Sequence, residues 1–213
     1  MPIFESISKK RNLSAPFRYA ISSRLSFPSL DPVRYLDALF RTSAMIVQWR
    51  EKDLPPEVAA PFVRHGIEVA RRAGKLFIVN SYTSMALEER ADGVHLTSLQ
   101  SVAEAVRARN ELARAEFLIG KSVHAVEEAL QAEAEGADYL LLGPVFDPLS
   151  KAPQSPPLGL EKLRQAVERV GIPVIALGGI DKNNAAEVLQ TGVAGIAGIS
   201  WVIEEVEALI RNG

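Results

Sequence analysis

Short apolar runs rich in β-branched residues alternate along the chain with longer stretches in which apolar residues recur at helical spacing. The apolar runs predict strands at residues 19–22, 45–49, 76–80, 93–96, 117–120, 139–143, 174–177 and 196–199. The helical stretches fall at residues 31–41, 57–73, 85–90, 101–113, 125–135, 160–170, 184–191 and 201–211. This alternation is typical of repeated βα units around a parallel sheet.

Eight βα repeats in one chain close most simply into an α/β fold of a single domain, the (β/α)8 or TIM barrel. We expect the barrel over residues 17–213, after an irregular lead at residues 1–16. An open doubly wound sheet is the rival, but it predicts a glycine-rich loop after the first strand, where residues 22–26 contain no glycine. Because such barrels carry their sites at the carboxyl ends of the strands, we expect the chemistry there.

Two kinds of residue set the expected helix boundaries. Gly74, Gly136 and Gly192 stand where a helix ends in the left-handed conformation. Pro55 and Pro56 are expected to lie outside the second helix, because proline lacks the N–H that a helix interior needs.

Composition narrows the possible partners. The 213 residues carry 24 basic and 26 acidic side chains, a net charge of -2, which gives no global field for nucleic acid or an anionic membrane. The chain contains no cysteine, which excludes disulfides, thiolate zinc sites and cysteine nucleophiles. No signal-like or membrane-spanning apolar stretch is visible, so we expect a cytoplasmic protein with neither a membrane nor a nucleic-acid partner.

A short turn follows each of the last two predicted strands. Gly178 and Gly179 come after the seventh strand, and Ile199 and Ser200 stand at the end of the eighth, each time before a predicted helix. Bare backbone N–H groups and the positive end of a helix dipole form a phosphate site, and this fold often has one after strands seven and eight. We therefore predict phosphate binding by these four residues; the alternative is that the glycines only make a tight turn.

Polar residues also follow the second and third strands. Gln48, Arg50 and Lys52 occupy alternate positions and so share one side of an extended chain. Two cations and an amide there suit an anionic ligand, although such a run is also typical of a solvated loop. Asn80 closes the third strand, where its amide can bind substrate or form an ordinary turn.

The fifth strand leads into Ser122 and His124, two residues apart on one side of the chain. An imidazole gives and takes protons near neutral pH, so His124 is the candidate catalytic residue and Ser122 the candidate substrate-binding residue beside it. The alternative is a serine that caps the next helix with a histidine in its first turn. His95, at the end of the fourth strand, is expected either to pack at the rim or to contact the ligand.

A long proline-rich loop at residues 144–157 carries Ser150 and Lys151. Loops of this length in compact domains are usually lids or disordered, and as a lid this one brings Lys151 over a bound anion. Metal ligands are poorly supported, because the three histidines are far apart in sequence and no two carboxylates stand at adjacent strand ends. We therefore expect neither a metal nor a cofactor.

Taken together, these residues resemble the thiamin phosphate synthase and TenI superfamily of barrels. The similarity runs from about residue 19 to residue 203 and rests on segments 48–52, 78–80, 91–96, 119–124, 136–146, 178–180 and 198–200. In the synthase branch, one carboxylate follows the strand-three asparagine and another follows the Gly-Val-His-Leu segment, and both bind the magnesium of a pyrimidine diphosphate. Here those positions hold Ser81 and Gln100, and the two-threonine motif of the synthase lid is replaced at residues 148–151.

The TenI branch is more similar around residues 119–129 and works without a metal. This resemblance implies a thiazole tautomerase, which aromatises carboxythiazole phosphate by a proton shift without a cofactor. His124 would then move the proton and Arg50 or Lys52 would face the substrate carboxylate, while the four residues that end strands seven and eight would hold the phosphate.

Two other functions stay open. One is a thiamin phosphate synthase that joins hydroxymethylpyrimidine diphosphate to thiazole phosphate, with magnesium on other ligands. The other is a non-catalytic protein that binds thiazole phosphate. In each case a small phosphorylated thiazole is the expected partner, and a homo-oligomer is compatible with the sequence.

Overall fold

The computed structural model describes residues 15–147 and 156–211, so most of the expected lead, and Ser150 and Lys151, lie outside the described residues. The strands are β1 (Phe17–Ile21), β2 (Ile46–Trp49), β3 (Leu76–Asn80), β4 (Gly93–Leu96), β5 (Leu118–Val123), β6 (Tyr139–Leu142), β7 (Val174–Leu177) and β8 (Gly195–Gly198). The helices are α2 (Pro32–Arg41), α3 (Pro56–Ala73), α4 (Thr83–Glu88), α5 (Val102–Glu111), α6 (Val126–Ala134), α7 (Gly159–Arg169), α8 (Ala185–Leu189) and α9 (Ser200–Arg211), with a 3-10 turn η1 (Arg24–Ser26).

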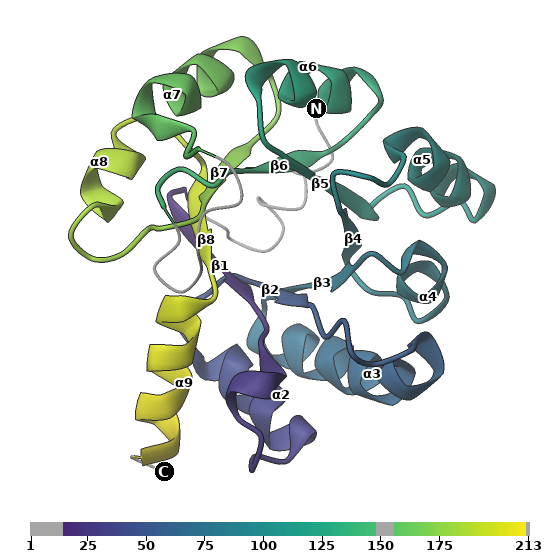
Figure 1. Cartoon of the computed structure of the whole chain (residues 1–213). Coiled ribbons are helices and arrows are strands. Elements are labelled where there is room, and N and C mark those ends of the chain that lie inside the picture. The colour runs from purple at the N-terminus through teal and green to yellow at the C-terminus, as the bar shows by residue number, and fades with distance from the viewer. Residues whose placement is uncertain (1–14, 148–155, 212–213) are drawn as a thin grey trace.

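The strands form one closed parallel barrel in the order β1 to β8, with the helices in a ring around it (Figure 1). Closure comes from the pairing of β1 with β8, in which Phe17 lies opposite Gly195. The predicted single-domain (β/α)8 barrel is therefore confirmed. In the described part of the chain, every helix falls short of the length or the apolar character that crossing a bilayer requires.

Alternate residues of each strand point into the barrel, where they form a small apolar cluster separate from the large core under the helices. Tyr19 and Tyr139 meet at the centre of this cluster, with their hydroxyl oxygens 3.0 Å apart. Gly120 lies beside them, and a Cβ on it would lie 2.1 Å from the Tyr139 ring. A glycine at this position thus makes room for a tyrosine on the neighbouring strand.

The structure corrects two boundaries. β5 continues to Val123 and α6 begins at Val126 with Ala125 as its N-cap, so Ser122 is a strand residue and the helix-capping alternative is wrong. Pro56 does not lie outside α3 but is its first residue. Proline is tolerated there because the first N–H of a helix has no intrahelical acceptor.

A buried ion pair fixes the strands that carry the site. The Arg109 guanidinium, on α5, donates to the Asp138 carboxylate at 2.7 Å and to the Phe117 carbonyl at 3.2 Å. The same Asp138 oxygen accepts the Ile119 N–H at 2.8 Å. Both charged side chains are about nine-tenths buried, so neither has water as a substitute partner. The pair therefore ties α5 to β5 and to the start of β6.

We predict that Asp138→Ala lowers the free energy of unfolding by about 3–5 kcal/mol, because it leaves a buried guanidinium and a backbone N–H without their acceptor. Urea denaturation measures the change. Glu161→Ala is the matched control, since Glu161 pairs with Arg164 on the surface of α7, and we expect it to cost less than about 0.5 kcal/mol. Equal effects of the two substitutions would contradict the assigned role of the buried pair.

Candidate functional site

Four polar side chains face inward at the carboxyl ends of β2, β3, β4 and β5, above the apolar filling of the barrel. They form two hydrogen-bonded pairs. The Gln48 amide donates to Asn80 Oδ1 at 2.8 Å, and His95 Nε2 lies 2.8 Å from Ser122 Oγ. The structure thus brings together three of the predicted binding residues and the histidine whose role was left open.

The run that follows β2 departs from the expected geometry. The strand ends at Trp49 and Lys52 lies in a turn, so the alternate-position argument does not extend to Lys52. Arg50 stays at the mouth, where its N–H donates to Ser22 Oγ at 2.8 Å. Lys52 lines a small pocket of about 160 Å³ together with Asn80.

Glu51, between those two cations, was not identified from the sequence. It folds back to the segment after β1, where Oε1 accepts from Ser22 Oγ at 2.5 Å and from the Arg24 N–H at 3.0 Å. Burial raises the pKa of Glu51, against the lowering effect of these hydrogen bonds. This carboxylate holds the first loop against the second and so places Arg50 through their shared partner Ser22.

His124 stands at the rim, directly after β5, with an exposed side chain. Its Nδ1 lies 2.5 Å from the Gly143 carbonyl oxygen at the end of β6. A carbonyl only accepts, so Nδ1 carries the hydrogen and Nε2 of the neutral ring keeps the lone pair. The backbone N–H of His124 donates to Glu128 on α6 at 2.8 Å. The Gly143 carbonyl thus sets the tautomer of this ring, and Glu128 holds the backbone that carries it.

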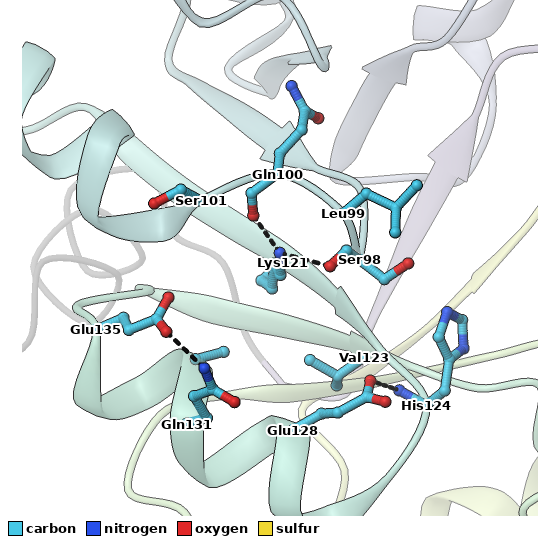
Figure 2. Close-up of a pocket in the computed structure, with 11 residues that line it drawn as sticks. Ser98, Leu99, Gln100, Ser101, Lys121, Val123, His124, Glu128, Gln131 and Glu135 are labelled. Atoms are coloured by element: carbon cyan, nitrogen blue, oxygen red, sulfur yellow. Dashed lines mark hydrogen bonds between the residues drawn. The ribbon is translucent and has the colours of Figure 1, made fainter.

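His124 stands at one end of a pocket of about 510 Å³ between the β4–α5 loop and α6 (Figure 2). Lys121, on the outer side of β5, closes the pocket floor and donates to the carbonyls of Thr97, Ser98 and Gln100. Because these contacts fix the loop after β4 to β5, they also fix the rim beside His124.

The predicted phosphate-binding residues lie at the same end of the barrel as His124. The loop after β6 connects the two sets, since Val145 N–H donates to the Leu177 carbonyl at 2.9 Å and Phe146 N–H to the Gly178 carbonyl at 3.1 Å. β7 in turn pairs with β8, where Leu177 lies opposite Ala197. The ends of β5 to β8 therefore form one continuous rim.

Both glycines of that rim have a packing reason. Gly178 and Gly179 have φ values of 99° and 64°, in the left-handed region that favours glycine. A Cβ on Gly178 would lie 2.6 Å from Pro144, and one on Gly179 would lie 2.5 Å from the Asp147 carbonyl oxygen. The tight turn and the overlying loop thus require glycine here, whether or not a phosphate binds.

The two helices that follow these turns differ. α9 begins at Ser200, directly after β8, so its N-terminal N–H groups lie at the rim as expected. α8 begins only at Ala185, after a turn in which Asn184 donates to the Gly179 carbonyl at 2.8 Å. The helix dipole expected beside Gly179 is therefore absent from that turn, and α9 is the helix that points at the predicted phosphate position.

A neutral network occupies the rim after β3 and β4. The Gln100 amide donates to the Ser81 carbonyl at 2.8 Å and accepts the Thr97 N–H at 3.0 Å. The Asn80 amide donates to Ser81 Oγ at 2.6 Å. Ser81 holds a φ of 68°, unusual for a residue other than glycine. These contacts use the polar groups of Asn80 and Gln100 within the protein.

This network does not fit a magnesium ion. Mg²⁺ prefers carboxylate oxygens and octahedral geometry, whereas the side chains here are a hydroxyl and two engaged amides. Among the described residues, no three His, Cys, Asp or Glu side chains converge as metal ligands. Glu51 is a carboxylate near this rim, and its oxygens already accept hydrogen bonds from Ser22 and Arg24.

His95 is buried in the barrel mouth with positive charges nearby. Its side chain is 2% exposed, and its ring centre lies 5.7 Å from that of Tyr139. Burial, reinforced by the positive charges of Lys121 and Arg50, lowers the pKa of His95 to about 3. The imidazole is therefore neutral at physiological pH.

The fold and the site define a (β/α)8-barrel protein with a polar rim that carries one exposed histidine. The family model described as thiamine monophosphate synthase matches residues 18–202. The chain belongs to this family and is an enzyme of thiamine biosynthesis. This one family model covers the synthase branch and the TenI branch together.

Curated relatives carry the synthase name. The thiamine-phosphate synthase of Methanocella arvoryzae is 42% identical over 80% of each chain, and that of Pyrococcus furiosus is 41% identical over 87% of this chain and 86% of its own. A solved thiamine phosphate pyrophosphorylase from Pyrococcus furiosus superposes with a TM-score of 0.77 at 34% identity, covering 92% of this chain and 96% of its own. An N-acetylmannosamine-6-phosphate 2-epimerase from Clostridium perfringens, at 17% identity and a TM-score of 0.67 over 95% of this chain and 94% of its own, shares the fold alone.

We predict that the buried neutral His95 makes the protein less stable as the pH falls from about 6.5 towards 3, because the unfolded chain binds a proton that the folded chain excludes. Its contribution reaches about 1.4 kcal/mol per pH unit. Unfolding free energies from pH 7 to 4 should fall more steeply for the natural protein than for His95→Gln. Parallel curves for the two proteins would contradict the assignment.

Proposed function

We propose that this enzyme is a metal-independent thiazole tautomerase that aromatises carboxythiazole phosphate by a proton shift at His124. The observation that carries the proposal is the neutral network around Ser81 and Gln100, at the positions where the resemblance places the carboxylates of the synthase branch. A tautomerisation needs no metal, since a proton leaves one position of the substrate and one returns at another.

His124 has the geometry of a single acid–base group. The Gly143 carbonyl holds Nδ1–H, so Nε2 is the atom that takes a proton from the substrate and returns it. The N-terminus of α9, at Ile199 and Ser200, supports binding of the phosphate tail, and Arg50 supplies positive charge for the carboxylate. Binding the tail at a fixed distance from the imidazole orients the carbon that loses the proton.

A thiamin phosphate synthase is the second candidate, and the names of the curated relatives favour it. In this chain a synthase would need other metal ligands than Ser81 and Gln100. Glu51 is the carboxylate near that rim, and recruiting it would break its hydrogen bonds to Ser22 and Arg24. A non-catalytic thiazole-phosphate binder is the third, and it predicts affinity without turnover.

We predict that His124→Ala lowers the turnover of carboxythiazole phosphate aromatisation at least tenfold and leaves ligand affinity nearly intact, because the ring moves the proton and the rim holds the substrate. The rise of thiazole absorbance measures turnover, and calorimetry measures affinity. His65→Ala is the matched control, since His65 lies on α3 and pairs with Asp37. Unchanged turnover in His124→Ala would remove His124 from the mechanism.

Magnesium removal distinguishes the two enzymes. We expect the aromatisation rate in excess EDTA to equal the rate in millimolar MgCl₂, because the described part of the rim offers no carboxylate pair for the ion. In the same preparations, hydroxymethylpyrimidine diphosphate and thiazole phosphate should give no thiamin phosphate. Product that forms only when magnesium is present would establish the synthase instead, and Glu51→Gln would then show whether Glu51 holds the metal.

A further inference from the structure

His95 and Ser122 form a hydrogen bond at the mouth of the barrel that the acid–base role of His124 does not use. The strands β4 and β5 are paired so that His95 lies opposite Gly120. The imidazole reaches Ser122, two residues further along β5, where Nε2 and Oγ are 2.8 Å apart.

The surroundings of His95 select the neutral ring. Tyr139 lies on one side, and the charged groups that act on the imidazole are the cations Lys121 and Arg50. Burial and these two positive charges lower the pKa of the ring to about 3. A neutral imidazole carries one hydrogen, on Nδ1 or on Nε2.

The partners of the two ring nitrogens select the tautomer. Nδ1 is buried and has no hydrogen-bond partner among the described residues, whereas Nε2 contacts Ser122 Oγ. A buried N–H donor is very rarely left unpaired in proteins, more rarely than a buried acceptor. The hydrogen therefore lies on Nε2 and is donated to Ser122 Oγ. The Ser122 hydroxyl hydrogen is then free to point at a ligand.

We propose that His95 is a positioning residue that holds the Ser122 hydroxyl as a hydrogen-bond donor towards an acceptor atom of the ligand, a ring nitrogen or a carboxylate oxygen. The inference rests on the proposed function only in that Ser122 contacts a phosphorylated thiazole. The state of His95 itself is a property of the protein without ligand. Its fixed N–H removes one of the orientations that the Ser122 hydroxyl would otherwise sample.

The tautomer is tested first, on the ligand-free protein. Long-range ¹H–¹⁵N spectra of ¹⁵N-histidine-labelled protein distinguish a protonated ring nitrogen from one with a lone pair, and comparison with His95→Gln assigns the signals. We expect protonated Nε2 and bare Nδ1 from pH 8 to 5. A hydrogen on Nδ1, or a charged ring at pH 6, would overturn the proposal whatever reaction the enzyme catalyses.

The coupling to Ser122 is tested with the aromatic carboxythiazole phosphate as probe, by calorimetry. We expect His95→Leu and Ser122→Ala each to weaken binding about tenfold, and the double variant to bind no more than twofold worse than either. His95→Gln, which keeps an N–H donor on a long side chain, should restore most of the affinity. Melting curves confirm that each variant is folded; if His95→Leu is not, His95→Ala replaces it.

The outcomes separate the two proposals. If the losses of affinity in His95→Leu and Ser122→Ala multiply in the double variant, the two residues are not coupled and the proposal is overturned. The same holds if His95→Leu binds the probe as tightly as the unsubstituted protein. Natural protein that binds the probe with the expected coupling but aromatises nothing would refute the tautomerase and support the positioning role.

Discussion

The closed ring of hydrogen bonds among eight parallel strands is the constraint on which the site depends. Because every strand runs in the same direction, all eight carboxyl ends meet at one rim, and residues from 48 to 200 become neighbours there. Closure also leaves the interior narrow, so some strand positions have room only for glycine. A side chain on Gly120 would collide with Tyr139 of the next strand, and one on Gly195 would collide with Phe17.

The filling of the barrel changes character from its centre to its mouth. The tyrosine pair at the centre is buried, and above it lie Gln48, Asn80, His95 and Ser122, which form two hydrogen-bonded pairs. Each of these four side chains has a partner on a neighbouring strand, although the buried Gln48 Oε1 and His95 Nδ1 have none among the described residues. The same pairing orients them, so the mouth presents a largely preset arrangement of donors and acceptors to a ligand.

The two rim histidines illustrate how surroundings separate identical side chains. His95 lies over Tyr139 with two cations in reach and is held neutral, whereas His124 is exposed and has its Nδ1 fixed by a backbone carbonyl. An imidazole that cannot become charged can only orient its neighbours, and an exposed ring with one committed nitrogen can exchange protons through the other. The side chains of Ser81 and Gln100 are uncharged in turn, which supports chemistry that moves protons without a metal.

Local pattern was sufficient for the order of the strands and helices, for the barrel, and for the placement of Gln48, Asn80, Ser122 and His124 at strand ends, because apolar periodicity is a property of consecutive residues. It failed where contacts join distant segments. The capping alternative for Ser122 falls only once β5 is seen to extend to Val123, and Glu51 and Gly143 gain their roles from Ser22 and His124, 29 and 19 residues away. His95 is the buried histidine because it lies inside the barrel against Tyr139 and Ser122, and the register that brings these residues together is decided by packing across the whole barrel rather than by neighbouring residues in the chain.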